Sequence, residues 1–524
     1  MTAFNHSCAF MQRTLRSNPM TLHGHGVTVA DVEAVARGDV QVALGTEARA
    51  RVVAARAVVD RIVRSGEPVY GVTTALGANT GAAIPVDDLV AYQQRAVRAR
   101  AVGVGPSFAR DVVRAMLFAR ICGMAVGGSG VSPTVLDTLL GMLNAGVHPV
   151  VPSKGSIGAA DLTSLSHLAL PLFGEGLAEY KGTICTGAEA FSLAGLEHAT
   201  LAAKDGLALI SSNAATAGHA ALVLVDCARA VDWLNVAAAL SFEGFRASPS
   251  PLDARVQAAR PAPGRVFVAQ RLRALLDGSA LNEPGAARRV QDPISLRCVT
   301  QVHGAAISAL WNARAATEVE LNAAAESPLV LVATEEMLSN GNFHTAELAL
   351  AFEALGLGLA QAALLCVQRC QRLCSPAMSG LPLQLTRLGP EHSGFAPLQK
   401  TLTALYNEIR HLAQAAMLDC LPVSEAIEDH ASMAPNVIAK TEAMLPALRY
   451  LAAIELLTAA QAVDLRANDH ATLGEGARAA YVAVRAVAPV LDEDRPLGFD
   501  VEALAASLAQ DAWPTNDLLA PRHG

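Results

Sequence analysis

The chain has 524 residues, of which 52% are apolar and 17% are charged, and its formal net charge is −8. Its 40 lysines and arginines are scattered along the sequence, so no basic patch indicates a nucleic-acid partner. Nine cysteines without disulfide or zinc-ribbon spacing, and an N-terminus without an apolar run and cleavage site, predict a cytoplasmic protein.

The N-terminal part of the chain, residues 19–203, reads as a loop-rich region of short helices. Residues 1–18, ahead of it, show no periodicity and are expected to form a flexible tail. Thr28 and Asp31 form a capping-box pattern that opens a helix, which Gly38 ends. Clusters of glycine, serine, threonine and proline predict loops, where ligands tend to bind. The predicted helices cover 47–65, 86–102 and 134–144, and the predicted loops cover 70–81, 123–133 and 149–160.

The remainder of the chain, residues 204–524, is predicted to be a bundle of long helices rich in alanine and leucine. Two uncharged stretches in it raise the question of a membrane span. Polar residues interrupt the first, 206–225, and the second, 354–367, is too short to cross a bilayer. Both are interpreted as helices buried on all sides in an oligomer core, so no membrane partner is expected. The long helices are predicted at about 200–222, 299–325, 344–375, 397–418 and 438–466.

Three cysteines lie one helical turn apart in the predicted helix 344–375. They are Cys366, Cys370 and Cys374, and no histidine or acidic residue interleaves with them. Packing is therefore favoured over metal binding, and no metal site is predicted.

Five loop segments combine unusual residues in a fixed order. They are Tyr70-Gly71-Val72-Thr73-Thr74, Gly155-Ser156-Ile157-Gly158-Ala159-Ala160-Asp161-Leu162, Gln291-Asp292-Pro293-Ile294-Ser295-Leu296-Arg297, Gly341-Asn342-Phe343-His344 and Glu428-Asp429-His430. Together they resemble the histidine and aromatic amino-acid ammonia-lyase family, from about Thr21 to beyond Pro435. The resemblance implies a mostly α-helical, fumarase/aspartase-like fold, in which a long-helix bundle forms the core of a homotetramer. It also implies a small-molecule substrate and sites shared between subunits.

The resemblance assigns roles to several residues. Tyr70 matches the tyrosine that removes a proton from the substrate's β-carbon. Because a phenol with a pKa near 10 is a poor base at neutral pH, the site must stabilise its phenolate. Arg297 matches the arginine that holds the substrate carboxylate as a bidentate pair. Arg100 is a second cation that could assist either the ionisation of Tyr70 or carboxylate binding. Further substrate-binding residues are expected at Gln291, Phe343 and Asn213.

Glu428 is the residue most informative about the substrate. The family's histidine enzymes carry Glu-Asp-His here, as this chain does, whereas its phenylalanine and tyrosine enzymes carry an amide in this region. A carboxylate complements an imidazole N–H and would be costly beside a phenyl ring. Glu428 therefore favours an imidazole-type ring, with a structural ion pair as the alternative.

The chain departs from the family where the electrophile is built. Active ammonia-lyases cyclise an Ala-Ser-Gly tripeptide just before Asp-Leu, whereas this chain has Ala159-Ala160, one residue shorter and without the serine. The dehydroalanine part of that group needs a serine hydroxyl to lose as water. Ser156 matches another, ordinary serine of the family. No electrophilic cofactor is therefore expected to form.

Other departures also concern residues that build or serve the electrophile. Ile294 stands where the family has a tyrosine, Ser211 where it has an asparagine, and Arg100 where it has a histidine. A quaternary ammonium leaves as a neutral amine and has no lone pair with which to attack an electrophile. A trimethylammonium substrate would thus make the tripeptide dispensable, and Ile294 could make room for its methyl groups.

Lys400 is a new cation, at a position where the family generally has an apolar residue. Burying an ammonium without a partner is expensive, so Lys400 is expected to face a carboxylate or an anionic substrate group. A thioimidazole ring would suit both Lys400 and Glu428. The alternative is a lysine at a helix start whose ammonium reaches solvent.

These departures resemble the ergothionase branch of the family, which lacks the tripeptide and adds a lysine. The implied reaction eliminates trimethylamine from ergothioneine to give thiourocanate, with Tyr70, Lys400 and Glu428 as catalytic residues and without cofactor or metal. Three alternatives remain: a lyase for another imidazole betaine, a histidine ammonia-lyase, and an inactive paralogue.

Overall fold

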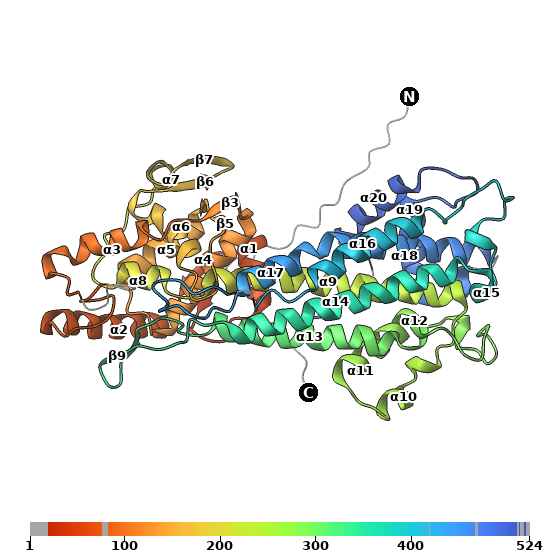
Figure 1. Cartoon of the computed structure of the whole chain (residues 1–524), viewed down its shortest axis with the longest axis horizontal. Coiled ribbons are helices and arrows are strands. Elements are labelled where there is room, and N and C mark those ends of the chain that lie inside the picture. The colour runs from red at the N-terminus through yellow and green to blue at the C-terminus, as the bar shows by residue number, and fades with distance from the viewer. Residues whose placement is uncertain are drawn as a thin grey trace. The chain divides into compact units, whose positions relative to one another are not determined.

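The computed structural model describes residues 19–75, 82–418, 420–466, 470–510, 513 and 518–519 (Figure 1). The expected flexible tail, 1–18, and part of the predicted loop 70–81 lie outside the described residues. The chain forms two compact units. The first comprises the described residues of Met1–His219, Glu318–His344 and Val423–Ile427, and the second those of Ala220–Thr317, Thr345–Pro422 and Glu428–Gly524.

The first unit contains short helices and all of the described strands. The predicted capping box is confirmed, because the Thr28 side chain accepts from the Asp31 amide and Asp31 bonds back to Thr28. Gly38 is the C-cap of this helix, as predicted. The helices are α1 (Val29–Arg37), α2 (Thr46–Ser65), α3 (Leu89–Arg98), α4 (Arg110–Val126), α5 (Pro133–Ala145), α6 (Leu162–Ala169), α7 (Gly187–Ala194) and α8 (Asp205–Ile210).

Four small sheets occupy the loop-rich parts of this unit. β1 (Met20–Leu22) pairs in parallel with β2 (Val42–Leu44). The other pairs are antiparallel: β3 (Val104–Ser107) with β5 (Pro152–Lys154), β4 (Val147–Pro149) with β6 (Leu177–Tyr180), β6 with β7 (Thr183–Thr186), and β8 (Leu329–Leu331) with β9 (Glu336–Leu338).

Helix α4 corrects the predicted loop 123–133, because the helix continues through Gly123 to Val126. Fourteen consecutive residues of α4, from 112 to 125, are buried. Among them the fully buried Arg120 pairs with the equally buried Glu326 at 2.8 Å. A helix buried on all sides lacks the apolar periodicity that marks a half-exposed one, so the Gly and Ser content misled the sequence interpretation.

The second unit is a bundle of long helices, several of which run beside one another (Figure 1). α9 begins in the first unit and α13 ends there; α14 packs against α16, α17 and α18. The helices are α9 (Ala214–Phe245), α10 (Ala254–Ala258), α11 (Pro263–Leu275), α12 (Ile294–Arg297), α13 (Val299–Leu321), α14 (Ala346–Leu373), α15 (Pro376–Ser379), α16 (Leu398–Leu412), α17 (Ala434–Ala443), α18 (Leu445–Leu465), α19 (Glu475–Val487) and α20 (Leu497–Leu508). Short 3-10 turns of the two units cover Val86–Asp88, Leu170–Phe173, Ser250–Leu252, Ala280–Asn282, Leu383–Leu385 and His470–Thr472.

Two predicted long helices are interrupted. The predicted helix 200–222 breaks at 211–213, between α8 and α9. The predicted helix 438–466 divides at Met444, and Pro446 lies in the first turn of α18, where its missing N–H costs least. The predicted helix 397–418 ends at Leu412, whereas 299–325 and 344–375 correspond to α13 and α14.

Within the part of the chain that the structure describes, three helical stretches are long and apolar enough to cross a membrane by length and composition. They are Asp205–Phe245, Ala346–Leu373 and Ala434–Leu465, and their most apolar segments are 100%, 61% and 72% buried inside the protein. The segment 354–367 was expected to be too short to cross a bilayer, but it belongs to α14, which is 28 residues long. Burial against other helices accounts for the apolar character of Asp205–Phe245. The interpretation of 354–367 as buried on all sides is wrong for the single chain, because Leu357 of α14 is 57% exposed.

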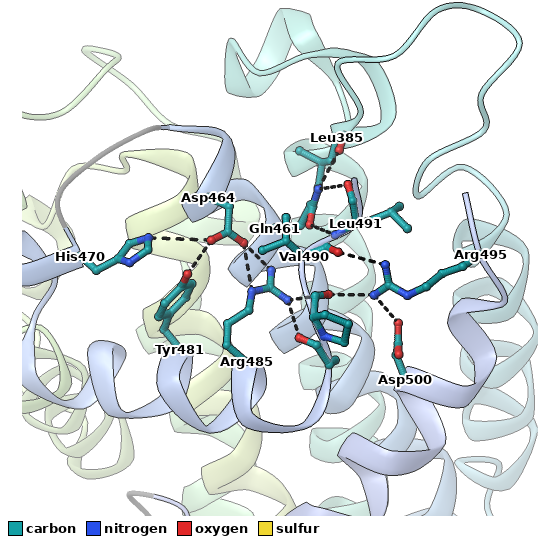
Figure 2. Close-up of polar contacts among 12 residues, drawn as sticks. Leu385, Gln461, Asp464, His470, Tyr481, Arg485, Val490, Leu491, Arg495 and Asp500 are labelled. Atoms are coloured by element: carbon teal, nitrogen blue, oxygen red, sulfur yellow. Dashed lines mark hydrogen bonds and ion pairs between the residues drawn. The ribbon is translucent and has the colours of Figure 1, made fainter. Parts of the chain in front are cut away.

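Polar contacts fasten α19 and the backbone at Leu491 to α18 (Figure 2). Asp464 accepts hydrogen bonds from the hydroxyl group of Tyr481 and from Arg485, both at 2.5 Å. Burial and the hydrogen bond to Asp464 raise the pKa of Tyr481 to about 12. One turn earlier, Gln461 Nε2 donates to the Leu491 carbonyl at 3.1 Å. These contacts tie Tyr481 and Arg485 of α19, and the backbone at Leu491, to α18.

Candidate active site

The loop 155–161 of the first unit is fastened to the start of α9 through Asp161. The buried Asp161 carboxylate accepts from the backbone N–H and the hydroxyl group of Thr216, both at 2.7 Å, and from Ser156 Oγ at 2.9 Å. The Asp161 amide donates to the Ser212 carbonyl at 2.7 Å. Burial raises the pKa of Asp161, and these hydrogen bonds oppose the rise.

Ala159 and Ala160 lie beside the segment that carries Phe343. Both alanines are 7% exposed, and Ala160 has a left-handed backbone with φ of 59°. The Ala160 amide donates to the Phe343 carbonyl at 3.3 Å, and Ala159 forms a β-bridge with His344. The structure therefore brings Phe343 next to the loop.

Asn213 joins the same cluster from the residue before α9. Its buried side-chain amide donates to Glu320 Oε2 at 2.9 Å and to the Asn342 carbonyl at 3.4 Å. The contact with Glu320, near the end of α13, was not expected from the sequence. Loop 155–161, Asn213 and Phe343 thus form one connected group within the first unit.

The residues of this loop do not fit the electrophilic group of the ammonia-lyases. A methylidene-imidazolone needs a serine side chain at the centre of the tripeptide, and the chain has methyl groups at Ala159 and Ala160. Ser156, the serine of the loop, donates to Asp161 and accepts from the Gly158 amide at 3.4 Å. Its hydroxyl group therefore holds the loop in place.

Tyr70 and Arg100 belong to the first unit as well. Tyr70 is 36% exposed and lies in the turn that follows α2. Arg100 follows α3, and its Nη1 donates to the Ala96 carbonyl at 3.0 Å, which satisfies an acceptor at the end of that helix. A role of Arg100 toward Tyr70 or a carboxylate stays a prediction.

Gln291, Ile294 and Arg297 lie in the second unit around the four-residue helix α12. Gln291 is exposed, Ile294 is 63% exposed, and Arg297 is half-buried. Arg297 Nε donates to the Asp292 carbonyl at 2.7 Å, which fixes the guanidinium without using Nη1 or Nη2. Burial raises the pKa of Asp292, whose carboxylate accepts from the Ser248 amide at 2.7 Å.

Lys400 is the third residue of α16 and lines a cavity of about 570 Å³. The expectation that this ammonium is buried against an anion is wrong for the single chain, in which Lys400 is exposed. Among the described residues, the ammonium is the only charged group that lines this cavity. The other lining residues are neutral: Gln371, Gln399, Thr403, Ala404 and Asn407. Thr403, Ala404 and Asn407 follow Lys400 at helical spacing, so the sequence could have identified them, but it held no signal for Gln371.

Glu428 is half-buried and follows a turn in which Ser424, Glu425 and Ala426 have positive φ. Four residues later, the Ser432 hydroxyl group bonds to the hydroxyl group of Thr345, the N-cap residue of α14, at 2.8 Å. The Glu428 segment is thus fastened near the start of α14.

Helix α14 separates the anchors of two predicted catalytic residues. Gln371, which lines the cavity with Lys400, lies near the end of α14, whereas Thr345 precedes its start. The 26 residues between them correspond to about 39 Å of helix. Within the second unit of one chain, the Lys400 cavity and the Ser432 anchor therefore lie at opposite ends of α14. Arg297 belongs to the Lys400 end, since Arg369 of α14 contacts the Ser295 carbonyl of α12.

Comparison with known proteins agrees with this fold. A family model described as aromatic amino acid lyase matches residues 27–486. Histidine ammonia-lyase from Symbiobacterium thermophilum is 40% identical over 483 residues, which are 92% of this chain and 95% of the relative.

Two solved structures cover nearly the whole chain. Ergothionase from Treponema denticola, in complex with desmethyl-ergothioneine sulfonic acid, is 32% identical with a TM-score of 0.91, over 94% of this chain and 99% of that one. Histidine ammonia-lyase from Trypanosoma cruzi is 32% identical with a TM-score of 0.85, over 94% of each chain. The expectation of a mostly helical ammonia-lyase fold is confirmed. The chain belongs to the aromatic amino acid lyase family and is a carbon–nitrogen lyase.

Proposed function

We propose that the protein is a cytoplasmic, homotetrameric lyase that eliminates trimethylamine from ergothioneine to give thiourocanate. The observation that carries the proposal is the Ala159-Ala160 pair in a loop whose serine is committed to Asp161. A chain that keeps this fold without the electrophile needs a substrate whose amine is already a good leaving group. A quaternary ammonium meets that requirement.

In the proposed reaction, Tyr70 acts as a phenolate and takes a proton from the β-carbon of the substrate. The electron pair of that C–H bond forms the double bond between the α- and β-carbons. The α-carbon–nitrogen bond breaks, and its electron pair leaves with the nitrogen as neutral trimethylamine. The exposure of Tyr70 is consistent with this role, because a base must reach its substrate.

The substrate carboxylate is assigned to Arg297. Its Nε bond to the Asp292 carbonyl orients the guanidinium, and Nη1 and Nη2 can then receive the two carboxylate oxygens. Gln291 and the exposed Ile294 lie on the same short segment. Ile294 supplies an apolar surface for trimethylammonium methyl groups where a tyrosine hydroxyl group would compete for space.

The thioimidazole ring is assigned to Lys400 and Glu428. Lys400 is the single charged group that lines its cavity among the described residues, and amide side chains surround it. An ammonium in that setting complements a sulfur that takes up negative charge as the β-proton leaves. Glu428 accepts a ring N–H. Delocalisation into the ring lowers the cost of the carbanion at the β-carbon.

The anchors on α14 support a site that is shared between subunits. The Lys400 cavity and the Ser432 anchor near Glu428 are separated by about 39 Å along one helix, which a substrate of amino-acid size does not span. We therefore propose that Lys400 and Arg297 of one chain act on a substrate together with Glu428 of another chain.

The decisive experiment incubates the purified protein separately with ergothioneine, hercynine and histidine, and follows the absorbance of the conjugated product and the release of trimethylamine or ammonia. Turnover of ergothioneine alone is expected. Turnover of hercynine with equal efficiency would favour an imidazole betaine without sulfur. No turnover of any of the three would favour an inactive paralogue.

Histidine ammonia-lyase is the second candidate, because a relative of that name is 40% identical across 92% of the chain and Glu428-Asp429-His430 suits an imidazole. That activity requires the electrophile, whose formation removes two waters. Intact mass spectrometry therefore separates the candidates: the unmodified mass is expected, and a loss of two waters together with turnover of histidine would overturn the proposal.

A further inference from the structure

A fully buried ion pair crosses the helical core of the second unit. Arg369 of α14 and Glu455 of α18 are both 0% exposed at their side chains. Two bonds join them, Nε to Oε1 at 2.5 Å and Nη2 to Oε2 at 2.9 Å. Ser241 of α9 donates its hydroxyl hydrogen to Glu455 Oε1 at 2.7 Å. Three long helices are therefore linked at one polar point.

The remaining arm of Arg369 points away from the ion pair toward α12. Its Nη1 donates to the Ser295 carbonyl at 3.4 Å and lies 3.5 Å from His303 Nε2. Ser295 is two residues before Arg297. Arg369 thus connects the core of the bundle to the short helix that carries the proposed carboxylate-binding arginine.

Helix α12 cannot hold itself in place. It has four residues, and a helix of that length has too few internal hydrogen bonds to offset the entropy of forming it. Its position comes from α13, which begins at Val299, from the buried side chain of Leu296, and from polar contacts with the rest of the unit. On the other side of Pro293, the Asp292 carboxylate accepts from the Ser248 amide, so Arg369 and Ser248 hold the segment at two points.

We infer that Arg369 is a positioning residue, which holds α12 and thereby fixes the orientation of Arg297 for a substrate carboxylate. The inference rests on the proposed role of Arg297. A buried ion pair is a poor source of stability, since desolvation of both charges opposes their attraction. The fork of a guanidinium, however, can bind a carboxylate with one edge and a carbonyl with the other, which an ammonium cannot do.

Two variants separate positioning from folding. The double variant Arg369→Met/Glu455→Met removes both charges together, so that neither is left unpaired in the core. The single variant Arg369→Lys keeps a charge beside Glu455 but lacks the arm that reaches Ser295. The control is Arg271→Met/Asp232→Leu, which removes another ion pair of the second unit, between the part-buried Arg271 of α11 and the fully buried Asp232 of α9.

Hydrogen exchange measures the position of α12 without any need for activity. The amides of Leu296, Arg297 and Cys298 donate within this short helix. They are expected to exchange at least ten-fold faster in both Arg369 variants and at the unaltered rate in the control. Unchanged exchange at these amides, or equal acceleration in the control, would overturn the inference.

Steady-state kinetics provide the second test. They use whichever of the three assayed substrates the unaltered protein turns over. KM is expected to rise ten-fold or more in both Arg369 variants with a smaller change in kcat, because carboxylate binding is weakened. A fall in kcat at constant KM would overturn it. If no substrate is turned over, the proposed function fails, and the exchange rates of α12 alone decide the inference.

Discussion

Tyr70 lies in a turn and is 36% exposed, and a phenylalanine at this position keeps the packing of its ring. Tyr70→Phe is therefore expected to lower kcat by 10² to 10⁴-fold, the usual contribution of a general base, while thermal unfolding stays unchanged. The control is Tyr180→Phe on β6. Equal loss of activity in both variants, or a large drop in melting temperature for Tyr70→Phe, would contradict the assignment.

His148 on β4 is a buried titratable side chain outside the proposed chemistry. Burial, Arg110 and Arg114 lower its pKa to about 4, against the opposing effect of Glu179, whose Oε2 lies 3.2 Å from Nδ1. Above pH 6.5 the ring is neutral in both the folded and unfolded states, and its contribution to stability is complete. Between pH 6.5 and 4 the unfolded state takes up the proton first, so stability falls as pH falls.

The pH dependence of unfolding tests this. From pH 7 to 5 the free energy of unfolding is expected to fall by about 2 kcal/mol through His148. Urea titrations of the unaltered protein and of His148→Gln at both pH values measure the difference. An identical fall in the two proteins would show that His148 is not responsible.

At the residue scale, the sequence indicated which residues to single out, but it did not predict their burial or their contact partners. Motif position singled out Phe343 and Asn213, and the structure brings both beside loop 155–161; their roles in substrate binding stay predictions. It could not foresee that Lys400 is exposed in the single chain, because burial depends on which surfaces pack against α16 and the sequence pattern does not contain that information. Glu320, the partner of Asn213, is distant in sequence and gave no signal.

At the scale of elements, close approach of the long helices depends on glycines. In α14, a Cβ at Gly358 would lie 2.8 Å from the Cα atom of Ala306 in α13. Gly358→Ala is expected to destabilise the fold by about 1–3 kcal/mol, because the two backbones must move apart. Gly498 of α20 is the matched control, since its Cβ would meet nothing within 4 Å.

Thermal and urea unfolding of Gly358→Ala and Gly498→Ala measure this difference. Gly498→Ala is expected to change stability by about 0.5 kcal/mol at most. Equal effects of the two substitutions would mean that helix propensity, and not helix packing, decides the outcome.

Element existence was predictable where periodicity was strong, and element ends were predictable where capping was local. The capping box of α1 and its glycine end are examples. The breaks within helices were not predictable. The helix α8 ends at the polar residues 211–213 because Asp161 bonds to Ser212 and Thr216 there, and such a tertiary contact leaves no local sequence pattern. The division of α17 from α18 could have been predicted from Pro446, which the periodicity alone did not reveal.

At the scale of the whole molecule, the two compact units are discontinuous in sequence, because α9 and α13 each contribute residues to both. The sequence pattern gave no sign that one helix contributes residues to both units. The continuous division at residue 203 therefore stays a prediction. The proposed sharing of sites between subunits can be tested by mixing inactive variants.

Lys400→Met and Glu428→Gln are each expected to be inactive alone, and co-expression of the two is expected to restore part of the activity, since a mixed tetramer contains some sites with both residues intact. The control pair is Lys400→Met with Arg297→Gln, which lie at the same end of α14 and should not restore activity. Restoration in both pairs, or in neither, would contradict the proposed sharing. Initial rates of mixed tetramers, isolated with two affinity tags, measure it.

The fastening of loop 155–161 has a consequence for engineering. Ser156 and Asp161 anchor the loop on either side of Ala159 and Ala160, and neither anchor depends on the residues between them. Insertion of one residue, to rebuild Ala-Ser-Gly ahead of Asp161, would keep the Ser156, Asp161 and Thr216 side chains that anchor the loop, whereas the contacts of Ala159 and Ala160 with Phe343 and His344 would have to form again. This scaffold therefore offers a direct route to install a self-cyclising tripeptide, and to ask whether the surrounding side chains accept a primary amine once the electrophile is restored.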